Sequence, residues 1–294
     1  MFWHLKIILI GKEGLVVIKK NSLLIRTLSS FVMLIIFFVM VSSNNFIFLI
    51  FSQFLLFLTS WEVVRMLEFK SFIKTKTDVS NFLLSKFHVR RYDLILIYLI
   101  NVLVFLLNFP FLGAQIFCFI LIFVCIFKLS NISVIKIICL LYVSLAFIFL
   151  NKMSQSIEFL DFIFFIVFFA MLVDVSAYFC GSIIGGPKII PSISPNKTVS
   201  GFIGGIIIPI FFCTIIFFNN SNISNIMYLS FLFSIISQAG DFLESGFKRY
   251  CCVKDSSNII PGHGGLLDRF DSIFALVIFV SIIKLLDYNF FFIV

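Results

Sequence analysis

Apolar runs that could cross a lipid bilayer recur along the whole chain, with short polar segments between them. A transmembrane helix needs about 20 mostly apolar residues, with a tolerance of a few. Only Ser42–Asn45 separates the first two runs, so these could also form one broken segment. The nine candidate runs are Leu28–Val41, Phe46–Trp61, Leu94–Asn108, Leu112–Lys128, Val134–Leu150, Phe159–Cys180, Phe202–Phe218, Ile226–Gly240 and Ile273–Val294.

The composition also indicates a protein that lies in a membrane. Hydrophobic residues make up 61% of the 294 residues and charged residues 12%, whereas soluble globular proteins carry about 25% charged residues. A core surrounded by water could not hide so much apolar surface, so lipid is the expected solvent. The predicted fold class is all-α: a polytopic integral membrane protein with about nine transmembrane helices.

The net charge of +8 follows the pattern of a membrane topology. Cytoplasmic loops of membrane proteins carry an excess of Lys and Arg. If the N-terminus is cytoplasmic, nearly all basic residues fall in the predicted inside segments, which are 1–27, 62–93, 128–133, 181–201 and 241–272. We therefore expect a cytoplasmic N-terminus, an outside C-terminus and no nucleic-acid partner. The basic segment 62–93 is either a solvated loop or a contact for anionic lipids.

Residues that could carry chemistry gather after residue 170, on the predicted cytoplasmic side. At the end of the eighth run, helical spacing places four polar residues on one face: Asp241, Glu244, Ser245 and Lys248. Asp268 and Asp271 share a face where the ninth run begins. Because Mg²⁺ prefers carboxylate oxygens and substrate phosphates, the two helix ends predict a metal site. The alternative is that Asp268 and Asp271 only balance the helix dipole.

A glycine cluster precedes the ninth run, at Gly262-His263-Gly264-Gly265. Glycines let backbone N–H groups approach phosphate oxygens closely, although a flexible turn would use them too. His263 could donate to a phosphate, act as a base or pack inside the turn.

A second polar segment covers residues 174–205. Asp174, Tyr178 and Gly181 would line one face of the sixth run, and an acid within a span indicates a functional role. Lys197 suits a phosphate, and Thr198 can cap the following helix.

Together the two segments resemble the signature of the phosphatidate cytidylyltransferase family. The resemblance covers roughly residues 170–275, so we divide the chain into variable N-terminal transmembrane helices at 1–157 and a catalytic region at 158–294. The matching positions are Gly240-Asp241, Glu244-Ser245, Lys248-Arg249, Lys254-Asp255, Pro261, His263-Gly264-Gly265, Asp268-Arg269-x-Asp271, Asp174-x-x-Ala177-Tyr178-x-x-Gly181 and Ser194-Pro195-x-Lys197-Thr198.

The resemblance implies transfer of CMP from CTP to phosphatidic acid, giving CDP-diacylglycerol and pyrophosphate, with the site at the cytoplasmic interface of the inner (plasma) membrane. It implies Mg²⁺ on Asp241, Asp268 and Asp271. The catalytic residues it implies are Lys197, Lys248, Arg249, His263, Asp241 and Asp268. The substrate-binding residues it implies are Ser194, Lys197, Thr198, Ser245, Lys248, Arg249, Lys254, Gly264, Gly265 and Arg269.

Other interpretations stay open. One is a CTP-dependent kinase of polyprenol or phytol, which would use an alcohol acceptor. A different class is a transporter with intramembrane carboxylates. A homodimer is also left open.

The chain departs from the family pattern beside Thr198. Val199-Ser200-Gly201 stands where the family usually has Trp-Glu-Gly, so the expected acid is missing, and Gly186-Pro187-Lys188 stands where a Gly-Lys pair is commoner. Since the other carboxylates remain, we expect an active enzyme in which Ser200 serves as a helix-start residue.

Overall fold

The computed structural model describes residues 22–74, 89–109, 134–156, 159–217 and 223–285, together with isolated positions between 113 and 122. Within these residues the regular secondary structure is helical, apart from two isolated β-bridges. The helices are α1 (Ser22–Ser42), α2 (Asn45–Lys74), α4 (Arg91–Leu106), α6 (Val134–Met153), α7 (Phe159–Ile183), α8 (Val199–Ile216), α9 (Ile223–Tyr250) and α10 (Leu267–Leu285). The all-α prediction is confirmed.

The helices follow the predicted apolar runs. Each run overlaps one helix except Leu112–Lys128, most of which lies outside the described residues. The first two runs are separate helices, because α1 ends at Ser42 and α2 begins at Asn45. Among the described residues, 6 helices are long and apolar enough to cross a membrane: α1, α2, α6, α7, α8 and α9. The chain is a multi-pass membrane protein.

The second helix extends beyond its apolar run. The predicted cytoplasmic segment 62–93 was expected to begin as a loop, but α2 continues to Lys74, so that boundary was wrong. The predicted run ends at Trp61, where charged residues begin. Two of them, Glu62 and Glu68, are buried because they find polar partners on other parts of the chain.

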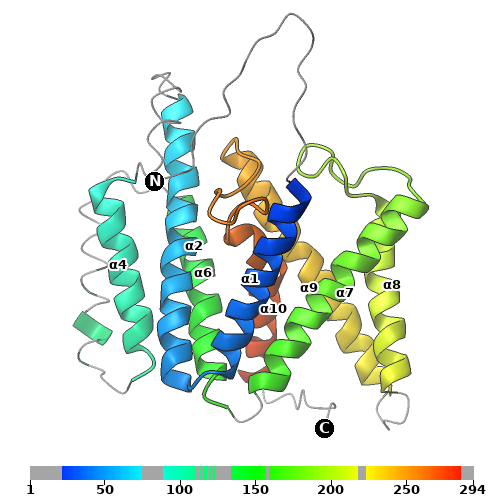
Figure 1. Ribbon diagram of the computed structural model, residues 1–294, viewed down its shortest axis with the longest axis horizontal. Helices are drawn as coiled ribbons and strands as arrows, with labels where there is room; N and C mark the ends of the chain where they lie inside the picture. The colour runs from blue at the N-terminus through cyan, green and yellow to red at the C-terminus, as the bar shows by residue number, and fades with distance from the viewer. Residues whose placement is uncertain are drawn as a thin grey trace, which may run out of the picture.

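Helices α1 and α2 run in opposite directions, and so do α6 to α10 in sequence, so that the polar connections meet at one end of the bundle (Figure 1). Loop 184–198, between α7 and α8, and loop 251–266, between α9 and α10, both lie at that end (Figure 1). Helix α2 packs against α4 and α6, while α9 packs against α8 and α10. Contacts between α6 and α10 join the two groups, and T-shaped rings of Phe147 and Phe274 with centroids 5.4 Å apart lie between them.

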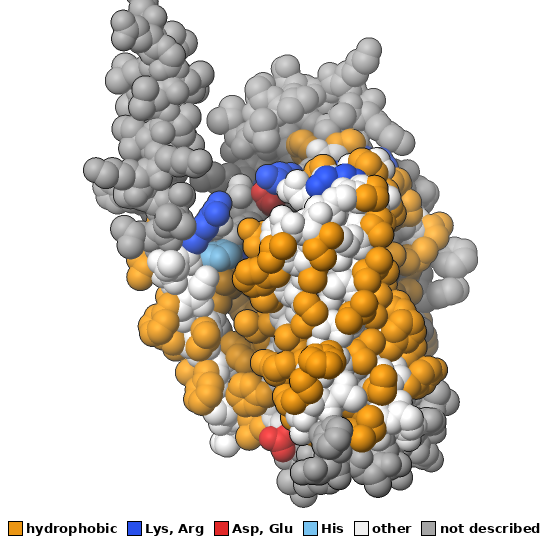
Figure 2. All heavy atoms as spheres, turned by 90° about the vertical axis from the view of Figure 1, so that its right-hand side faces the viewer, with side chains coloured by type: hydrophobic (Ala, Val, Ile, Leu, Met, Phe, Trp, Pro, Cys, Tyr) orange, Lys and Arg blue, Asp and Glu red, His pale blue; other side chains and the backbone are white. Residues whose placement is uncertain are grey.

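The exterior of the bundle is apolar. Large hydrophobic side chains such as Phe38, Phe168 and Phe211 are exposed, and Figure 2 shows hydrophobic side chains over the middle of one face, with Lys and Arg near one end. This distribution is what lipid around the middle and water at the ends would require.

Close packing of α7 and α8 positions the loop between them. A Cβ atom at Gly201 would lie 2.6 Å from the carbonyl oxygen of Ala177, so only glycine allows the two backbones to approach this closely. Thr198 begins α8 by accepting a hydrogen bond from the Gly201 N–H at 3.1 Å. The sequence prediction that Thr198 caps this helix is confirmed.

Candidate active site

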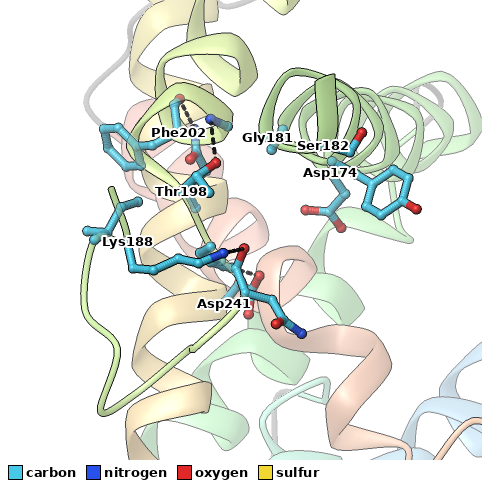
Figure 3. Close-up of a pocket in the computed structure, with 14 residues that line it drawn as sticks. Asp174, Gly181, Ser182, Lys188, Thr198, Phe202 and Asp241 are labelled. Carbon is cyan, nitrogen blue, oxygen red and sulfur yellow. Dashed lines mark hydrogen bonds and ion pairs between the residues drawn. The ribbon is translucent and has the colours of Figure 1, made fainter. Parts of the chain in front are cut away.

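A cavity of about 480 Å³ lies between α7, α8 and α9, beside loop 184–198. Figure 3 shows Asp174 of α7 and Asp241 of α9 on opposite sides of this space. The predicted face of α7 is confirmed, because Asp174, Tyr178 and Gly181 all line the cavity. The loop contributes Lys188, Asn196, Lys197 and Thr198.

The cavity contains an ion pair. The Lys197 ammonium donates to the Asp241 carboxylate, and both side chains are partly exposed, at 30% and 24%. The Ser245 hydroxyl donates to Oδ1 of the same carboxylate at 3.2 Å. Asp241 therefore holds an ammonium group at the cavity wall, where an anionic ligand could meet it.

Backbone hydrogen bonds close loop 184–198 and so fix where Lys197 starts. The Ile189 N–H donates to the Lys197 carbonyl at 3.2 Å, and the Val199 N–H donates to the Pro187 carbonyl at 3.0 Å. Ser200 adds a third tie, because its hydroxyl donates to the Gly185 carbonyl. Ser200 does stand in the first turn of α8, but Thr198 provides the cap and Ser200 holds the loop.

A second polar cluster joins α9 to α10. Nζ of Lys248 lies 2.9 Å from Oδ1 of Asp268 and 3.2 Å from Oε1 of Glu244. Asp268 also accepts hydrogen bonds from the backbone N–H groups of Ser256 and Gly265. The predicted meeting of these two helix ends is confirmed.

Carboxylates form the boundary between the two clusters. Asp174 and Asp241 both line the larger cavity. Both carboxylate oxygens of Glu244 are buried, with the Lys248 ammonium 3.2 Å from Oε1. Asp271 shares with Glu244 the wall of a second, mostly apolar cavity of about 220 Å³.

These donors suit a hard cation. In the part of the chain that the structure describes, no group of three or more His, Cys, Asp or Glu side chains is already arranged to hold a metal ion. The donor set nevertheless consists of carboxylate oxygens, which Mg²⁺ prefers, and the Glu244 carboxylate is buried beside the Lys248 ammonium. The assignment of Mg²⁺ to Asp241, Asp268 and Asp271 stays a prediction.

His263 faces α1 and is absent from the lining of the larger cavity. Its Nδ1 lies 2.8 Å from the Ser29 hydroxyl and its Nε2 lies 3.1 Å from the Ser30 hydroxyl. Partial burial and the neighbouring Arg269 and Arg26 cations hold the pKa of His263 below its ordinary value. The neutral imidazole is therefore favoured at this position.

The remaining predicted residues lie around the two loops. Arg249 donates to the carbonyls of Ile193, at 3.1 Å, and Val253, at 3.2 Å, and so ties the loops together. Arg269 donates to the His263 carbonyl at 2.6 Å. Lys254 is exposed and Ser194 is half-buried. Their roles toward a substrate stay predictions.

Sequence reasoning missed Glu62. This carboxylate comes from α2, in the half of the chain that carries no part of the signature, yet it contacts loop 251–266. The available signal was an acid directly after the apolar run that ends at Trp61, which is costly near lipid unless it is paired.

Known proteins resemble this chain in sequence. A model described as the cytidylyltransferase family matches residues 24–286. The phosphatidate cytidylyltransferase of Staphylococcus haemolyticus (strain JCSC1435) is 44% identical over 136 residues, which are 45% of this chain and 51% of the relative. The proteins of the same name from Staphylococcus aureus (strain COL) and Staphylococcus saprophyticus are 43% and 42% identical over the same shares. The chain spans about half the length of the curated relatives it matches.

Proposed function

The chain belongs to the cytidylyltransferase family, and from this premise we propose that it transfers CMP from CTP to phosphatidic acid, giving CDP-diacylglycerol and pyrophosphate. The relatives named phosphatidate cytidylyltransferase suggest the acceptor. The observation that carries the proposal is the Lys197–Asp241 pair in a cavity at the polar end of the bundle. An ammonium group held by a carboxylate is suited to neutralising a phosphate.

The location of the cavity suits two substrates of different solubility. CTP is dissolved in water, whereas the acyl chains of phosphatidic acid stay in the bilayer, so a site for both must lie at the interface. Loop 184–198 lines the cavity and lies at the end where the polar loops meet (Figure 1). We propose that this end is cytoplasmic, with the N-terminus on the same side, in the inner (plasma) membrane.

The proposed reaction is a displacement at phosphorus. A phosphate oxygen of phosphatidic acid forms a bond to the α-phosphorus of CTP, the bond from that phosphorus to the bridging oxygen breaks, and its electron pair leaves with pyrophosphate. Because the second pKa of a phosphate monoester is about 6, the attacking group is largely dianionic near pH 7 and needs little general base. Charge cancellation between the two anions and in-line alignment are the main requirements.

The basic residues of the site would meet these requirements. Lys197 is oriented by Asp241, and Lys188 lines the same cavity. Lys248 stands between Glu244 and Asp268 at the end of α9. We assign phosphate neutralisation to Lys197, Lys248 and Arg249.

We also propose that Asp241, Asp268 and Asp271 hold Mg²⁺. When bound, the ion would neutralise phosphate charge. Ion pairs with Lys197 and Lys248 already orient two of these carboxylates, and Glu244 supplies buried oxygens beside them.

One assay of the purified protein tests the reaction. Phosphatidic acid in mixed micelles is incubated with Mg²⁺ and with CTP that carries ³²P at either the α- or the γ-phosphate. CMP transfer places the α-label in the lipid fraction and releases the γ-label as pyrophosphate. A kinase would instead transfer the γ-label to an added polyprenol, and a transporter would transfer neither label. Label transfer that does not depend on phosphatidic acid would contradict the proposal.

A further inference from the structure

Glu62 of α2 is a buried carboxylate that joins two serines inside loop 251–266 to the end of that loop. Its side chain is fully buried, with a relative exposure of 0%. Oε2 accepts hydrogen bonds from the Ser256 hydroxyl at 3.1 Å and the Leu267 N–H at 2.7 Å. Oε1 accepts hydrogen bonds from the Ser257 hydroxyl and, at 2.9 Å, from the Leu266 N–H. Each oxygen thus joins one residue early in the loop to one at its end.

The same contacts cap α10 from another helix. This helix begins at Leu267, so the N–H groups of Leu266 and Leu267 have no helical acceptor of their own. A carboxylate satisfies them and interacts favourably with the positive end of the helix dipole. The next residue is Asp268, one of the carboxylates assigned to the site. Glu62 therefore contacts the backbone directly before Asp268.

The loop is shaped around this carboxylate. A Cβ atom at Gly265 would lie 2.6 Å from Oε1 of Glu62 and 2.9 Å from the Ser257 nitrogen, so a larger residue would displace the contact. The Gly265 N–H donates instead to Oδ2 of Asp268 at 2.8 Å. Glu62 and Asp268 together accept hydrogen bonds from three successive backbone N–H groups, those of Gly265, Leu266 and Leu267.

We propose that Glu62 is a positioning residue, which acts by holding the start of α10 and through it Asp268 and Asp271. The proposal rests on the proposed function for its catalytic part. Its structural part concerns only loop 251–266. If the proposal is right, an N-terminal helix helps to position a site whose signature residues all lie in the C-terminal half.

The sharpest probe is Glu62→Gln, because it keeps the shape of the side chain. Each oxygen of Glu62 accepts a backbone N–H, so an amide nitrogen in either orientation would face a donor. Glu68→Gln is the matched control. Glu68 is a buried carboxylate of the same helix that pairs with Lys136 and Arg90 instead of the loop.

Two measurements on the purified full-length proteins decide the proposal. Hydrogen–deuterium exchange of peptides covering 256–267 should become about tenfold faster in Glu62→Gln, and kcat for CMP transfer should fall about 10–100-fold with KM for CTP changed less than about twofold. Glu68→Gln should leave the exchange of these peptides and the kcat of folded protein at wild-type values. Unchanged exchange in Glu62→Gln, or equal acceleration in both variants, would overturn the proposal.

If Glu62→Gln does not fold, the Ser256→Ala/Ser257→Ala variant removes two donors to Glu62 and should accelerate loop exchange to a smaller extent, whereas wild-type exchange there contradicts the proposal. If the wild-type protein transfers no CMP, the proposed function fails while the exchange measurements still decide whether Glu62 holds the loop.

Discussion

Nζ of Lys248, near the end of α9, lies 2.9 Å from Oδ1 of Asp268, in the first turn of α10. Asp268 also accepts the Ser256 and Gly265 N–H groups at 3.0 and 2.8 Å. Asp241, by contrast, contacts only side chains among the hydrogen bonds the structure describes, namely Lys197 and Ser245. The two carboxylates should therefore respond differently to the same substitution.

We predict that Asp241→Asn and Asp268→Asn each lower turnover by about 100-fold or more while the protein stays inserted. Asp268→Asn should also accelerate hydrogen exchange in 256–267, because an amide accepts hydrogen bonds less strongly than a carboxylate. Asp241→Asn should not accelerate it. The double variant should be little worse than either single one, because both residues serve one centre.

Asp161→Asn is the control for this pair, since Asp161 is an exposed carboxylate near the start of α7, at the other end of that helix. Near-normal turnover with Mg²⁺ in either active-site variant would show that its carboxylate is not required.

A buried ion-pair network between α2, α4 and α6 is expected to contribute strongly to the free energy of unfolding. Nζ of Lys136 lies 3.0 Å from Oε1 of Glu68 and 2.9 Å from Oδ1 of Asp93, and all three side chains are buried. Lys136→Met would leave both carboxylates without this cation, so we expect the free energy of unfolding to fall by about 3–5 kcal/mol. Thermal unfolding in detergent should show a lower midpoint, with kcat per folded molecule nearly unchanged.

The matched control is Lys152→Met, because Lys152 is an exposed lysine in the last turn of the same helix. Adding Glu68→Gln and Asp93→Asn to Lys136→Met should recover much of the loss. An unfolding midpoint equal to that of the wild type in Lys136→Met would mean that the network contributes little.

The sequence predicted those features that depend on local spacing. Apolar run lengths located the helices, and the i+3, i+4 and i+7 positions on α9 placed Glu244, Ser245 and Lys248 beside Asp241. Capping chemistry located the start of α8 at Thr198. Each of these patterns lies within one helix, where the period of the helix determines which residues are neighbours.

Contacts between distant segments could not be predicted in this way. Glu62 with Leu267, Lys136 with Asp93, and Ser29 with His263 each join different helices or loops. Which helices are neighbours depends on packing in three dimensions, which helical periodicity does not specify. For the same reason, the end of α2 was placed too early, because the partners that allow Glu62 and Glu68 to be buried lie far away in the sequence.

His263 predicts a pH dependence of stability. Its pKa lies below the ordinary value, so as the pH falls below about 6.5 the unfolded chain gains a proton before the folded one does. The free energy of unfolding must therefore decrease as the pH falls, until the pH is below the pKa of His263 in the folded protein. His263→Gln should remove this part of the decrease while keeping side-chain contacts to the Ser29 and Ser30 hydroxyls.

Thermal midpoints measured between pH 5 and pH 8, a range that brackets the ordinary histidine pKa of about 6.5, should show a shallower decline for His263→Gln than for the wild type. The Ser29→Ala/Ser30→Ala variant is a useful second case, because it leaves the imidazole in place. Identical pH profiles for His263→Gln and wild type would contradict the lowered pKa.

The proposed topology predicts which loops are accessible from outside the cell. Asn44, between α1 and α2, and Asn258, in the loop between α9 and α10, are both exposed. With Cys252→Ser as the background, Asn44→Cys should react with a membrane-impermeant maleimide in intact cells. Asn258→Cys should react only after permeabilisation. Labelling of Asn258→Cys but not of Asn44→Cys in intact cells would reverse the orientation.

Ser200 tests whether the missing acid beside Thr198 matters. Its hydroxyl donates to the Gly185 carbonyl and lies 3.0 Å from the Thr198 hydroxyl. Ser200→Ala should therefore lower the free energy of unfolding by about 1 kcal/mol, the typical net value of one hydrogen bond, with little change in kcat. Ser200→Glu should be tolerated, because an acid near the start of a helix interacts favourably with the dipole.

Ser42→Ala is the matched control for the loss of one hydroxyl, because Ser42 is exposed and donates only within its own helix turn, to Phe38 and Val39. The activity assay distinguishes two explanations for serine at position 200, namely the loss of a required acid and a purely structural role. If the family's acid were a required ligand, the wild-type protein would be inserted but inactive, and Ser200→Glu would restore turnover. An active wild type whose kcat does not rise in Ser200→Glu would instead show that Asp241, Asp268 and Asp271 suffice, and that the residue at this position mainly fastens loop 184–198 to α8.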